Sequence, residues 1–289
     1  MAGAGAELAV FERGDPSNPT VVLVHGFPDT HAMWDPVAER LAERFHVVAY
    51  DVRGTGSSSA PRPTREYRME LLLEDLAAVI EATSPNERVH LVGHDWGSIQ
   101  GWDAVGHPHL EARLASYTSM GAPALDHAAA WIRSRVRRPT PRALWQLLRQ
   151  GLRSVYIVAF RMPGARRAWR RNARLFVRYL ERVEKVDTST GYPAPTLAAD
   201  ASNGVNLYRA VMGKRLRRVR ERITTVPVQL VVLLRDRYVT PALLDGIERI
   251  APGMVRQEID AGHWAPRTHP ELIADLIASF VALHAREAA

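Results

Sequence analysis

The sequence predicts an α/β protein in which a mostly parallel β-sheet carries helices on both faces and is interrupted once by a helical insert. Short apolar, β-branched runs alternate with segments of helical periodicity along residues 7–118 and again along residues 226–283. Between the two blocks, residues 126–222 show helical patterns broken by prolines and little that is typical of strands. Regular alternation of strand and helix is typical of a doubly wound parallel sheet.

The first block contains five expected strands and three expected helices. The run Val21–Val24 is apolar at every position, as expected of a strand covered on both faces. In Met69–Ala82 the leucines fall on one helical face. The other expected strands are Glu7–Arg13, His46–Tyr50, Val89–Val92 and Leu114–Thr118, and the other expected helices are Trp34–Phe45 and Trp96–Val105.

The second block predicts strand Val226–Leu234, helix Pro241–Ile250, strand Met254–Ile259 and helix Pro270–Leu283. We therefore expect one core domain formed by residues 1–125 and 223–289, with residues 126–222 as a helical, arginine-rich cap inserted between them.

Composition limits the class of protein. Hydrophobic residues make up 46% and charged residues 24% of the chain, which is ordinary for a soluble enzyme. No apolar run is long enough to span a membrane, and Met1–Ala6 lacks the basic start and apolar segment of a signal peptide. Cysteine is absent, so neither a disulfide framework nor a thiolate metal site is expected. We expect a cytoplasmic protein.

The positive charge is concentrated in the insert. Residues 131–222 contain 23 Lys and Arg against 5 Asp and Glu, a balance of +18, so the rest of the chain carries −11 within the total of +7. No nucleic-acid-binding motif accompanies this charge, and we expect no nucleic-acid partner. The arginines form either an ordinary solvated face or a surface that attracts an anionic partner such as membrane lipid.

A Gly-x-Asp-x-Gly motif at Gly93–Gly97 ends one expected strand and begins a helix. This is the sharp strand-to-helix turn that presents a nucleophile above a parallel sheet, with Asp95 in the position that serine takes in G-x-S-x-G. The simpler interpretation is a tight turn in which Asp95 caps the helix.

Two further candidate groups follow later strands. Asp236 comes after Leu230–Leu234, and His263 comes after Met254–Ile259. Functional groups gather at the carboxyl ends of parallel strands, and the chain order nucleophile, acid, histidine is the one that α/β-hydrolases use. Each residue alone also has a simple structural interpretation, as a surface acid and a loop histidine. The backbone amides of Phe27 and Trp96 are the expected oxyanion-hole donors.

Three other histidine motifs have structural interpretations. We interpret His25 as a buried structural histidine and His94 as part of the turn. The motif His107-Pro108-His109 has no supporting carboxylate cluster, so it is interpreted as a helix end and not as a metal site.

The motifs His25-Gly26-Phe27-Pro28, Gly93–Gly97 and Gly262-His263-Trp264 resemble those of the α/β-hydrolase-fold epoxide hydrolases, and the resemblance spans nearly the whole chain. It implies an α/β-hydrolase fold with a helical cap that carries two tyrosines. Tyr156, within Ser154–Gly164, and Tyr208, within Asn206–Arg209, match their settings, although each is also explained as a core aromatic residue.

The resemblance is strongest to actinobacterial modules that can precede a short-chain dehydrogenase, and no second domain of that kind is expected here. Three departures from the family pattern remain, and one is the arginine-rich cap, which is not a hallmark of the family. The amino terminus is one strand short of the usual sheet, and Arg235 and Arg237 flank Asp236, where their charges would favour its ionised state if they lie close.

The resemblance implies hydrolysis of a small, apolar epoxide to a vicinal diol, with no cofactor or metal. A carboxylate is already an anion at neutral pH, so Asp95 could attack a saturated carbon and form an alkyl ester. His263, oriented by Asp236, would then activate water, and the two tyrosines would protonate the alkoxide.

Two alternatives remain open. Haloalkane dehalogenases share the Asp-Trp pair, but they hold halide with an asparagine where this chain has Phe27, which favours the epoxide. A non-catalytic binding protein with this fold is the second alternative.

Overall fold

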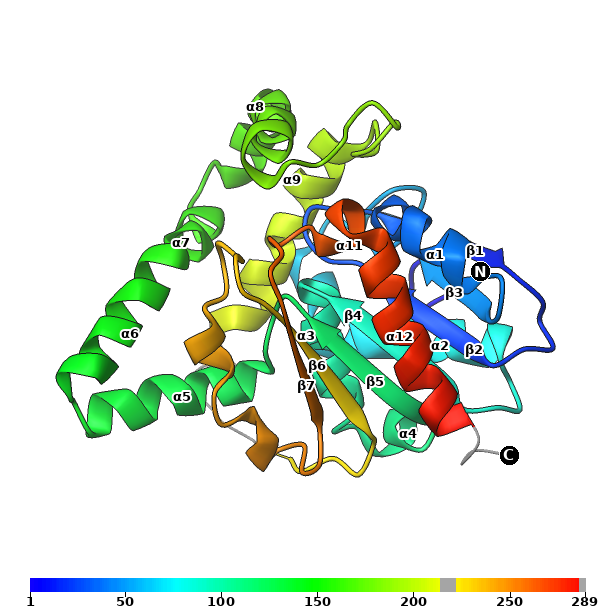
Figure 1. Ribbon diagram of the computed structural model, residues 1–289. Helices are drawn as coiled ribbons and strands as arrows, with labels where there is room; N and C mark the ends of the chain where they lie inside the picture. The colour runs from blue at the N-terminus through cyan, green and yellow to red at the C-terminus, as the bar shows by residue number, and fades with distance from the viewer. Residues whose placement is uncertain (214–221, 286–289) are drawn as a thin grey trace.

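The computed structural model describes residues 1–213 and 222–285, and its centre is a seven-stranded sheet (Figure 1). The strand order is β1-β3-β2-β4-β5-β6-β7. Only β1 runs antiparallel to its neighbour; every other pair is parallel. The predicted fold class is confirmed. The strands are β1 Val10–Arg13, β2 Thr20–Val24, β3 His46–Tyr50, β4 Val89–His94, β5 Leu114–Met120, β6 Val228–Leu233 and β7 Val255–Ile259.

Alternate residues of the strands form two separate cores, one on each face of the sheet. In β2, Val22 and Val24 pack with helices α2 (Met69–Thr83) and α3 (Trp96–Ala104). Val21 and Leu23 pack on the opposite face with α1 (Asp35–Leu41) and α12 (Pro270–Ala285). Because side chains alternate along a strand, an apolar residue at every position requires cover on both faces, and the helices provide it.

In the described part of the segment between β5 and β6, helices are joined by loops, of which residues 185–196 form the longest, and Figure 1 shows the segment bending around one end of the sheet. No strand occurs in residues 125–213. Residues 214–221, which carry part of the predicted cap charge, lie outside the described residues, as do 286–289. The predicted domain division stays a prediction. The helices are α5 Leu125–Arg137, α6 Pro141–Arg153, α7 Val155–Arg161, α8 Ala165–Tyr179, η3 Leu180–Glu184, α9 Leu197–Leu207 and η4 Tyr208–Met212.

Two predicted helices differ from the structure. The expected helix Pro241–Ile250 is instead two 3-10 turns, η5 (Pro241–Leu244) and η6 (Ile247–Arg249). Gly246 between them has a φ of 87°, a left-handed conformation that an α-helix cannot contain. The expected helix Trp34–Phe45 begins as the 3-10 turn η1 (His31–Trp34) and ends earlier, at Leu41.

Three short elements complete the core: η2 (Thr64–Tyr67), α4 (Pro108–Glu111) and α11 (Ala265–Thr268). None of the helices in the described ranges is both long and apolar enough to cross a lipid bilayer.

Candidate active site

Asp95 lies in the turn between β4 and α3 with φ 53° and ψ −117°, one of two non-glycine residues with positive φ among those described. The motif glycines serve close packing and do not themselves take the strained conformation. A Cβ on Gly97 would lie 2.1 Å from the Val24 carbonyl oxygen, and one on Gly93 would lie 2.4 Å from the Gly97 carbonyl oxygen. The strain therefore falls on Asp95 itself, which is a feature typical of functional sites.

The Asp95 carboxylate is held from the β2 side of the sheet. The Phe27 amide donates a hydrogen bond to Asp95 Oδ1 over 2.8 Å. Gly26 allows this approach, because a Cβ there would lie 2.4 Å from the same oxygen. Trp96 is the first residue of α3, where backbone amides have no partner within the helix. Its role as the second oxyanion donor stays a prediction.

His263 and Asp236 complete the group at the carboxyl ends of the strands. Nδ1 of His263 donates to Asp236 Oδ2 over 2.7 Å, and Nε2 lies 3.7 Å from Asp95 Oδ2. The amides of Tyr238 and Val239 donate to Asp236 Oδ1 over 2.7 and 3.0 Å. Both oxygens of this buried carboxylate therefore have partners, which fixes the imidazole with Nε2 toward Asp95.

The charges of the group act on one another. Burial alone would raise the pKa of Asp95, but the hydrogen bond and charge of His263 outweigh it and hold that pKa below its usual value. Burial would lower the pKa of His263, but Asp236 and then Asp95 outweigh it and raise the pKa well above 6.5. At neutral pH the free site therefore contains a carboxylate at Asp95 beside an imidazolium at His263.

The two predicted tyrosines lie above this group. Their rings are 6.0 Å apart between centroids, and the Tyr208 ring lies 5.0 Å from that of Trp96. Tyr208 begins η4, a stretch of π-helix, a geometry that is frequent at functional sites. Burial first, then the charge of Asp95 and the neighbouring phenols, raise the pKa values of Tyr156 and Tyr208 well above 10, so both hydroxyls stay protonated.

These residues enclose a cavity of about 140 Å³ with a predominantly aromatic wall. Asp95 and His263 face it from the core, and the tyrosines face it from the insert. Its lining comprises Phe27, Pro28, Asp95, Tyr156, Phe160, Trp169, Phe176, Tyr208, Tyr238, His263 and Trp264.

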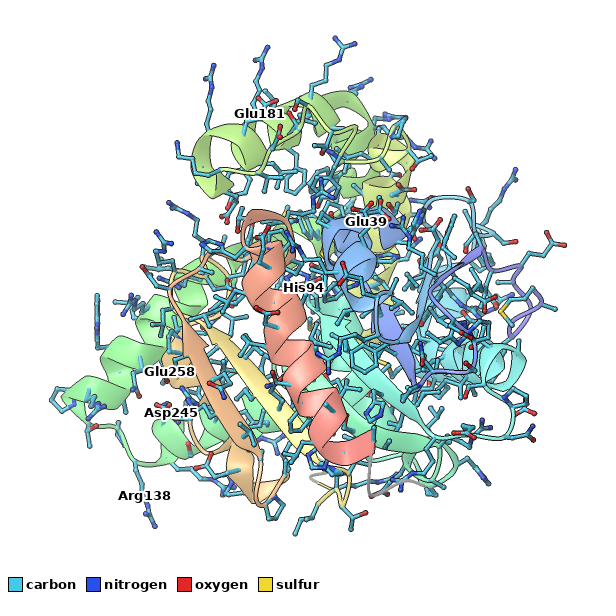
Figure 2. The ribbon with its side chains drawn as sticks, turned by 45° about the vertical axis from the view of Figure 1, so that its right-hand side comes forward. Glu39, His94, Arg138, Glu181, Asp245 and Glu258 are labelled. Atoms are coloured by element: carbon cyan, nitrogen blue, oxygen red, sulfur yellow. The ribbon has the colours of Figure 1, made fainter. Side chains whose placement is uncertain are left out.

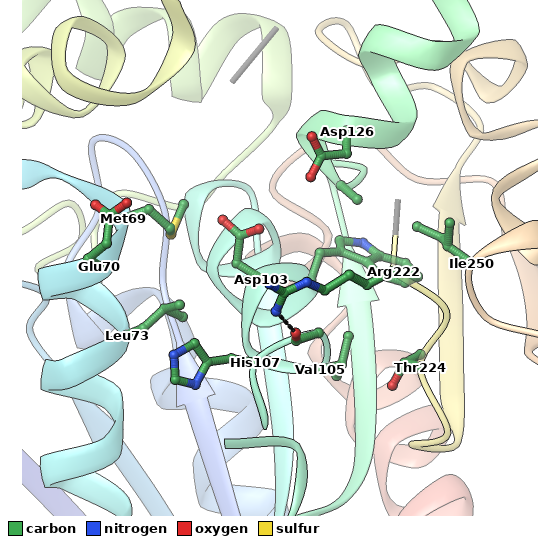
Figure 3. Close-up of a pocket in the computed structure, with 13 residues that line it drawn as sticks. Met69, Glu70, Leu73, Asp103, Val105, His107, Asp126, Arg222, Thr224 and Ile250 are labelled. Atoms are coloured by element: carbon green, nitrogen blue, oxygen red, sulfur yellow. Dashed lines mark hydrogen bonds between the residues drawn. The ribbon is translucent and has the colours of Figure 1, made fainter. Parts of the chain in front are cut away.

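A second cavity, of about 200 Å³, contains Asp103, Asp126 and Arg222 but none of the predicted site residues (Figure 3). Arg222 crosses it to reach the Gly106 carbonyl. The site residues predicted from the sequence therefore lie at the smaller, aromatic cavity.

Sequence reasoning missed three residues of the site. The Tyr238 ring lies 4.8 Å from that of His263, and its hydroxyl donates to Tyr179 over 3.2 Å. Trp264 donates through Nε1 to Asp29 Oδ2 over 3.1 Å, and Tyr192 from the insert donates to Oδ1 of the same carboxyl. Trp264 belongs to the Gly262-His263-Trp264 motif, and Asp29 and Tyr238 lie within two residues of Pro28 and Asp236, which was the available signal.

The flanking arginines do not contact the Asp236 carboxylate. Arg235 pairs with Asp260 over 2.9 Å, and Arg237 lies 3.6 Å from Glu184. The predicted effect of these two charges on Asp236 required them to contact its carboxylate, and they contact other acids instead.

The histidines outside the triad make structural hydrogen bonds. His25 accepts from the Val52 amide over 3.0 Å, and His94 donates to the His263 carbonyl over 2.8 Å. Burial lowers the pKa of His94 to about 4, so it is neutral and adds no charge beside Asp95. His107 precedes α4. Within the described ranges, no group of three or more His, Asp or Glu side chains could hold a metal ion.

A family model described as alpha/beta hydrolase fold matches residues 19–270 of the chain. Probable oxidoreductase EphD of Mycobacterium tuberculosis is 38% identical over 295 residues, covering 96% of this chain and 48% of that protein. Epoxide hydrolase A of the same organism is 36% identical over 162 residues, 55% of this chain and 46% of that protein. The chain thus spans about half the length of these curated relatives.

Two solved structures show the same fold. An epoxide hydrolase from Vigna radiata superposes with a TM-score of 0.77 at 22% identity, covering 98% of this chain and 96% of that one. An epoxide hydrolase from Bacillus megaterium, bound to its diol product, gives a TM-score of 0.75 at 22% identity, covering 97% and 98%. The resemblance indicated by the motifs is confirmed at the level of family and fold.

Proposed function

The chain belongs to the alpha/beta hydrolase fold family, and from that premise we propose that it is an epoxide hydrolase with Asp95 as its nucleophile. The observation that carries the proposal is the position of the Asp95 carboxylate, 3.7 Å from His263 and facing Tyr156 and Tyr208 across one aromatic cavity. An acid that is ionised at rest suits attack on a saturated carbon, and two protonated phenols suit a developing alkoxide.

In the first step, an oxygen of Asp95 attacks an epoxide carbon and the carbon–oxygen bond of the ring breaks. Because the Phe27 amide holds Oδ1, Oδ2 is the attacking oxygen, and Oδ1 becomes the ester carbonyl. The alkoxide takes a proton from Tyr156 or Tyr208. The predominantly apolar lining favours a small, apolar epoxide.

In the second step, His263 removes a proton from water, and the hydroxide attacks the ester carbon of Asp95. The oxyanion forms at Oδ1, where the Phe27 amide already donates and the Trp96 amide would be the second donor. Each such donor contributes about 3–4 kcal/mol in comparable sites. Before this step the imidazolium proton of His263 passes to the tyrosinate. Collapse moves the proton of the attacking hydroxide to the departing diol oxygen, and His263 keeps the proton taken from water, as in the free site, so one epoxide and one water give one vicinal diol.

The ester itself would change His263. Alkylation removes the negative charge of Asp95, which is one of the influences that raise the pKa of His263. The pKa of His263 should therefore fall when the ester forms, and the imidazole becomes a base at the step that needs one. The tyrosines of the insert would thus act in the first step, and His263 of the core would act as the base in the second.

The decisive experiment is a single turnover of styrene oxide in oxygen-18 water with enzyme in excess. The first diol should carry unlabelled oxygen from Asp95, and the label should enter the carboxylate of the protein. Label in the first diol would contradict the covalent mechanism.

A panel of epoxides and haloalkanes, assayed for diol and for halide, separates the two enzyme classes. Halide release without diol formation from any epoxide would favour the dehalogenase. Binding without turnover of either class would favour a non-catalytic protein.

A further inference from the structure

Helices α6 and α7 of the insert carry a series of exposed apolar side chains. On α6, Leu144, Trp145, Leu148 and Leu152 are each between 53% and 66% exposed. Their spacing of one, three and four residues places them along one side of the helix. The face continues onto α7, where Val155 and Val158 are exposed, and onto Met162 after it. Isolated exposed leucines are ordinary, but seven exposed apolar residues on consecutive helices are not.

The inner side of α6 is already occupied by the core. Gln150 donates to the Tyr238 carbonyl over 2.8 Å and accepts from the Thr240 amide over 2.9 Å. Arg153 donates to the Asp236 carbonyl. These contacts fix the rotation of α6, so its exposed apolar side chains face away from the sheet. In Figure 1, α6 itself runs along the outer edge of the molecule.

The surroundings of this face are strongly basic. Residues 127–180 contain 14 arginines and no aspartate or glutamate. Arg142 and Arg149 are exposed on α6 itself, beside the apolar side chains. Figure 2 shows long side chains ending in nitrogen that project outward from the insert, including Arg138. A helix with leucine and tryptophan on one side and arginine beside them has the pattern of interfacial, membrane-bound helices.

We propose that α6 and α7 dock the protein onto an anionic lipid surface, with the apolar face inserted at the headgroup boundary and the arginines on the lipid phosphates. A second copy of the chain would cover the apolar face, but it would bring two acid-free arginine surfaces together. A nucleic acid would satisfy the arginines and leave the leucines exposed to water. Anionic lipid is the occupant that satisfies both.

Docking in this manner places the cavity next to the lipid. Tyr156 and Phe160 of α7 line the cavity, whereas Val155 and Val158 of the same helix are on the exposed face. One helix therefore separates the lipid surface from the cavity, and an apolar compound dissolved in the membrane has a short path to it. The docking itself does not depend on the proposed epoxide chemistry.

The test is co-sedimentation of the whole chain with vesicles of phosphatidylcholine alone or with about one third phosphatidylglycerol. We expect binding to the anionic vesicles to be at least about tenfold tighter, because several arginines lie near the lipid phosphates and each adds electrostatic attraction. Raising salt to about 0.5 M should weaken it through screening. Equal binding to both vesicles, or none, would overturn the proposal.

Matched variants test the contributions of the leucines and of the arginines separately. Leu148→Ser with Leu152→Ser should reduce binding about tenfold or more, whereas Leu272→Ser with Leu283→Ser, exposed leucines on α12, should not. Arg142→Gln with Arg149→Gln should reduce binding and its salt dependence, and Arg62→Gln with Arg65→Gln serves as the control of equal charge. Loss of vesicle binding in the two control variants, but not in the α6 variants, would contradict the placement of the lipid-binding surface on α6.

Trp145 reports insertion directly. Its emission should shift to the blue on anionic vesicles, and Trp145→Phe should remove the shift while most of the sedimentation remains. Light scattering without lipid tests the competing occupant. A dimer that dissociates in the Leu148→Ser, Leu152→Ser variant, together with no vesicle binding by the parent, would assign the face to a second copy and overturn the proposal.

Discussion

The two walls of the aromatic cavity are held in place by different forces. On the core wall, backbone amides and buried ion pairs fix the reactive groups: Phe27 donates to Asp95, and Tyr238 donates to Asp236. On the insert wall, Tyr156 and Tyr208 are positioned by ring contacts with each other and with neighbouring aromatic residues, among them Phe27 at 5.3 Å from Tyr208. Asp29 lies where the walls meet, bonded to Tyr192 of the insert and Trp264 of the core.

The two walls should differ in how well they tolerate substitutions. Hydrogen bonds to a fixed backbone set position and charge together, so a change in the core wall should alter the chemistry at once. Aromatic packing sets position through contact area, and a tyrosine can lose its hydroxyl while its ring still packs. We therefore expect a substitution in the core wall to abolish one step of the reaction, whereas a substitution in the insert wall should only slow the reaction.

Asp95→Ala should give the largest effect, a loss of turnover of about 10⁴-fold or more, because no other residue can form the ester. Asp95→Gly should be equally inactive but more stable than Asp95→Ala by about 1 kcal/mol, since glycine adopts a φ of 53° without strain. Single-turnover assays and thermal melting check both parts. Residual activity near the parent level in either variant would remove Asp95 from the proposed role.

His263→Gln should stop the cycle at the ester, which mass spectrometry would detect as a mass shift on the peptide that contains Asp95. In the parent enzyme, ester hydrolysis should speed up as pH rises, because only neutral His263 removes a proton from water, and Asp236 keeps its pKa raised. Alkylation should stay flat over the same range, because the pKa of Asp95 is lowered. A folded variant that consumes epoxide without accumulating ester would contradict the role of His263.

Tyr156→Phe and Tyr208→Phe should each slow alkylation, and the double variant should slow it by about 10²–10⁴-fold. Ester hydrolysis should change less, because the Phe27 amide and His263 remain. Tyr50→Phe, a buried tyrosine outside the cavity, is the matched control. Parent-like alkylation by the double variant would require another proton donor.

Asp29→Asn should give the smallest change in activity, but it should alter how the stability of the folded protein depends on pH. Burial, opposed by the hydrogen bonds of Tyr192 and Trp264, raises the pKa of Asp29 from 3.8 to about 7. The folded protein thus binds this proton more tightly than the unfolded chain does. Stability that is present below pH 4 is therefore lost as pH rises to about 7, up to about 4 kcal/mol.

Denaturant titrations at several pH values measure this slope. The asparagine cannot titrate, so the slope between pH 4 and pH 7 should flatten, whatever the absolute stability of the variant. An unchanged slope would mean that Asp29 is ionised in the folded protein. Its raised pKa would then not be the cause of the pH dependence of stability.

The core wall could be predicted from the sequence because its signals are local. Glycines around Asp95, an apolar run before Asp236 and another before His263 each specify a strand end, and parallel strands bring their carboxyl ends to one edge. The same signals failed at Pro241–Ile250, where the helical pattern gave no indication that Gly246 would adopt a φ of 87°.

The sequence by itself therefore determined the fold class, the chain order of the three proposed catalytic residues and the basic character of the insert. The tertiary structure alone decided which aromatic residues meet above Asp95, which partners Arg235 and Arg237 take, and that Tyr192 reaches Asp29 across 163 positions of chain. It also decided that the leucines of α6 face outward. Contacts between distant segments depend on how whole elements pack, and no local pattern of residues encodes that packing.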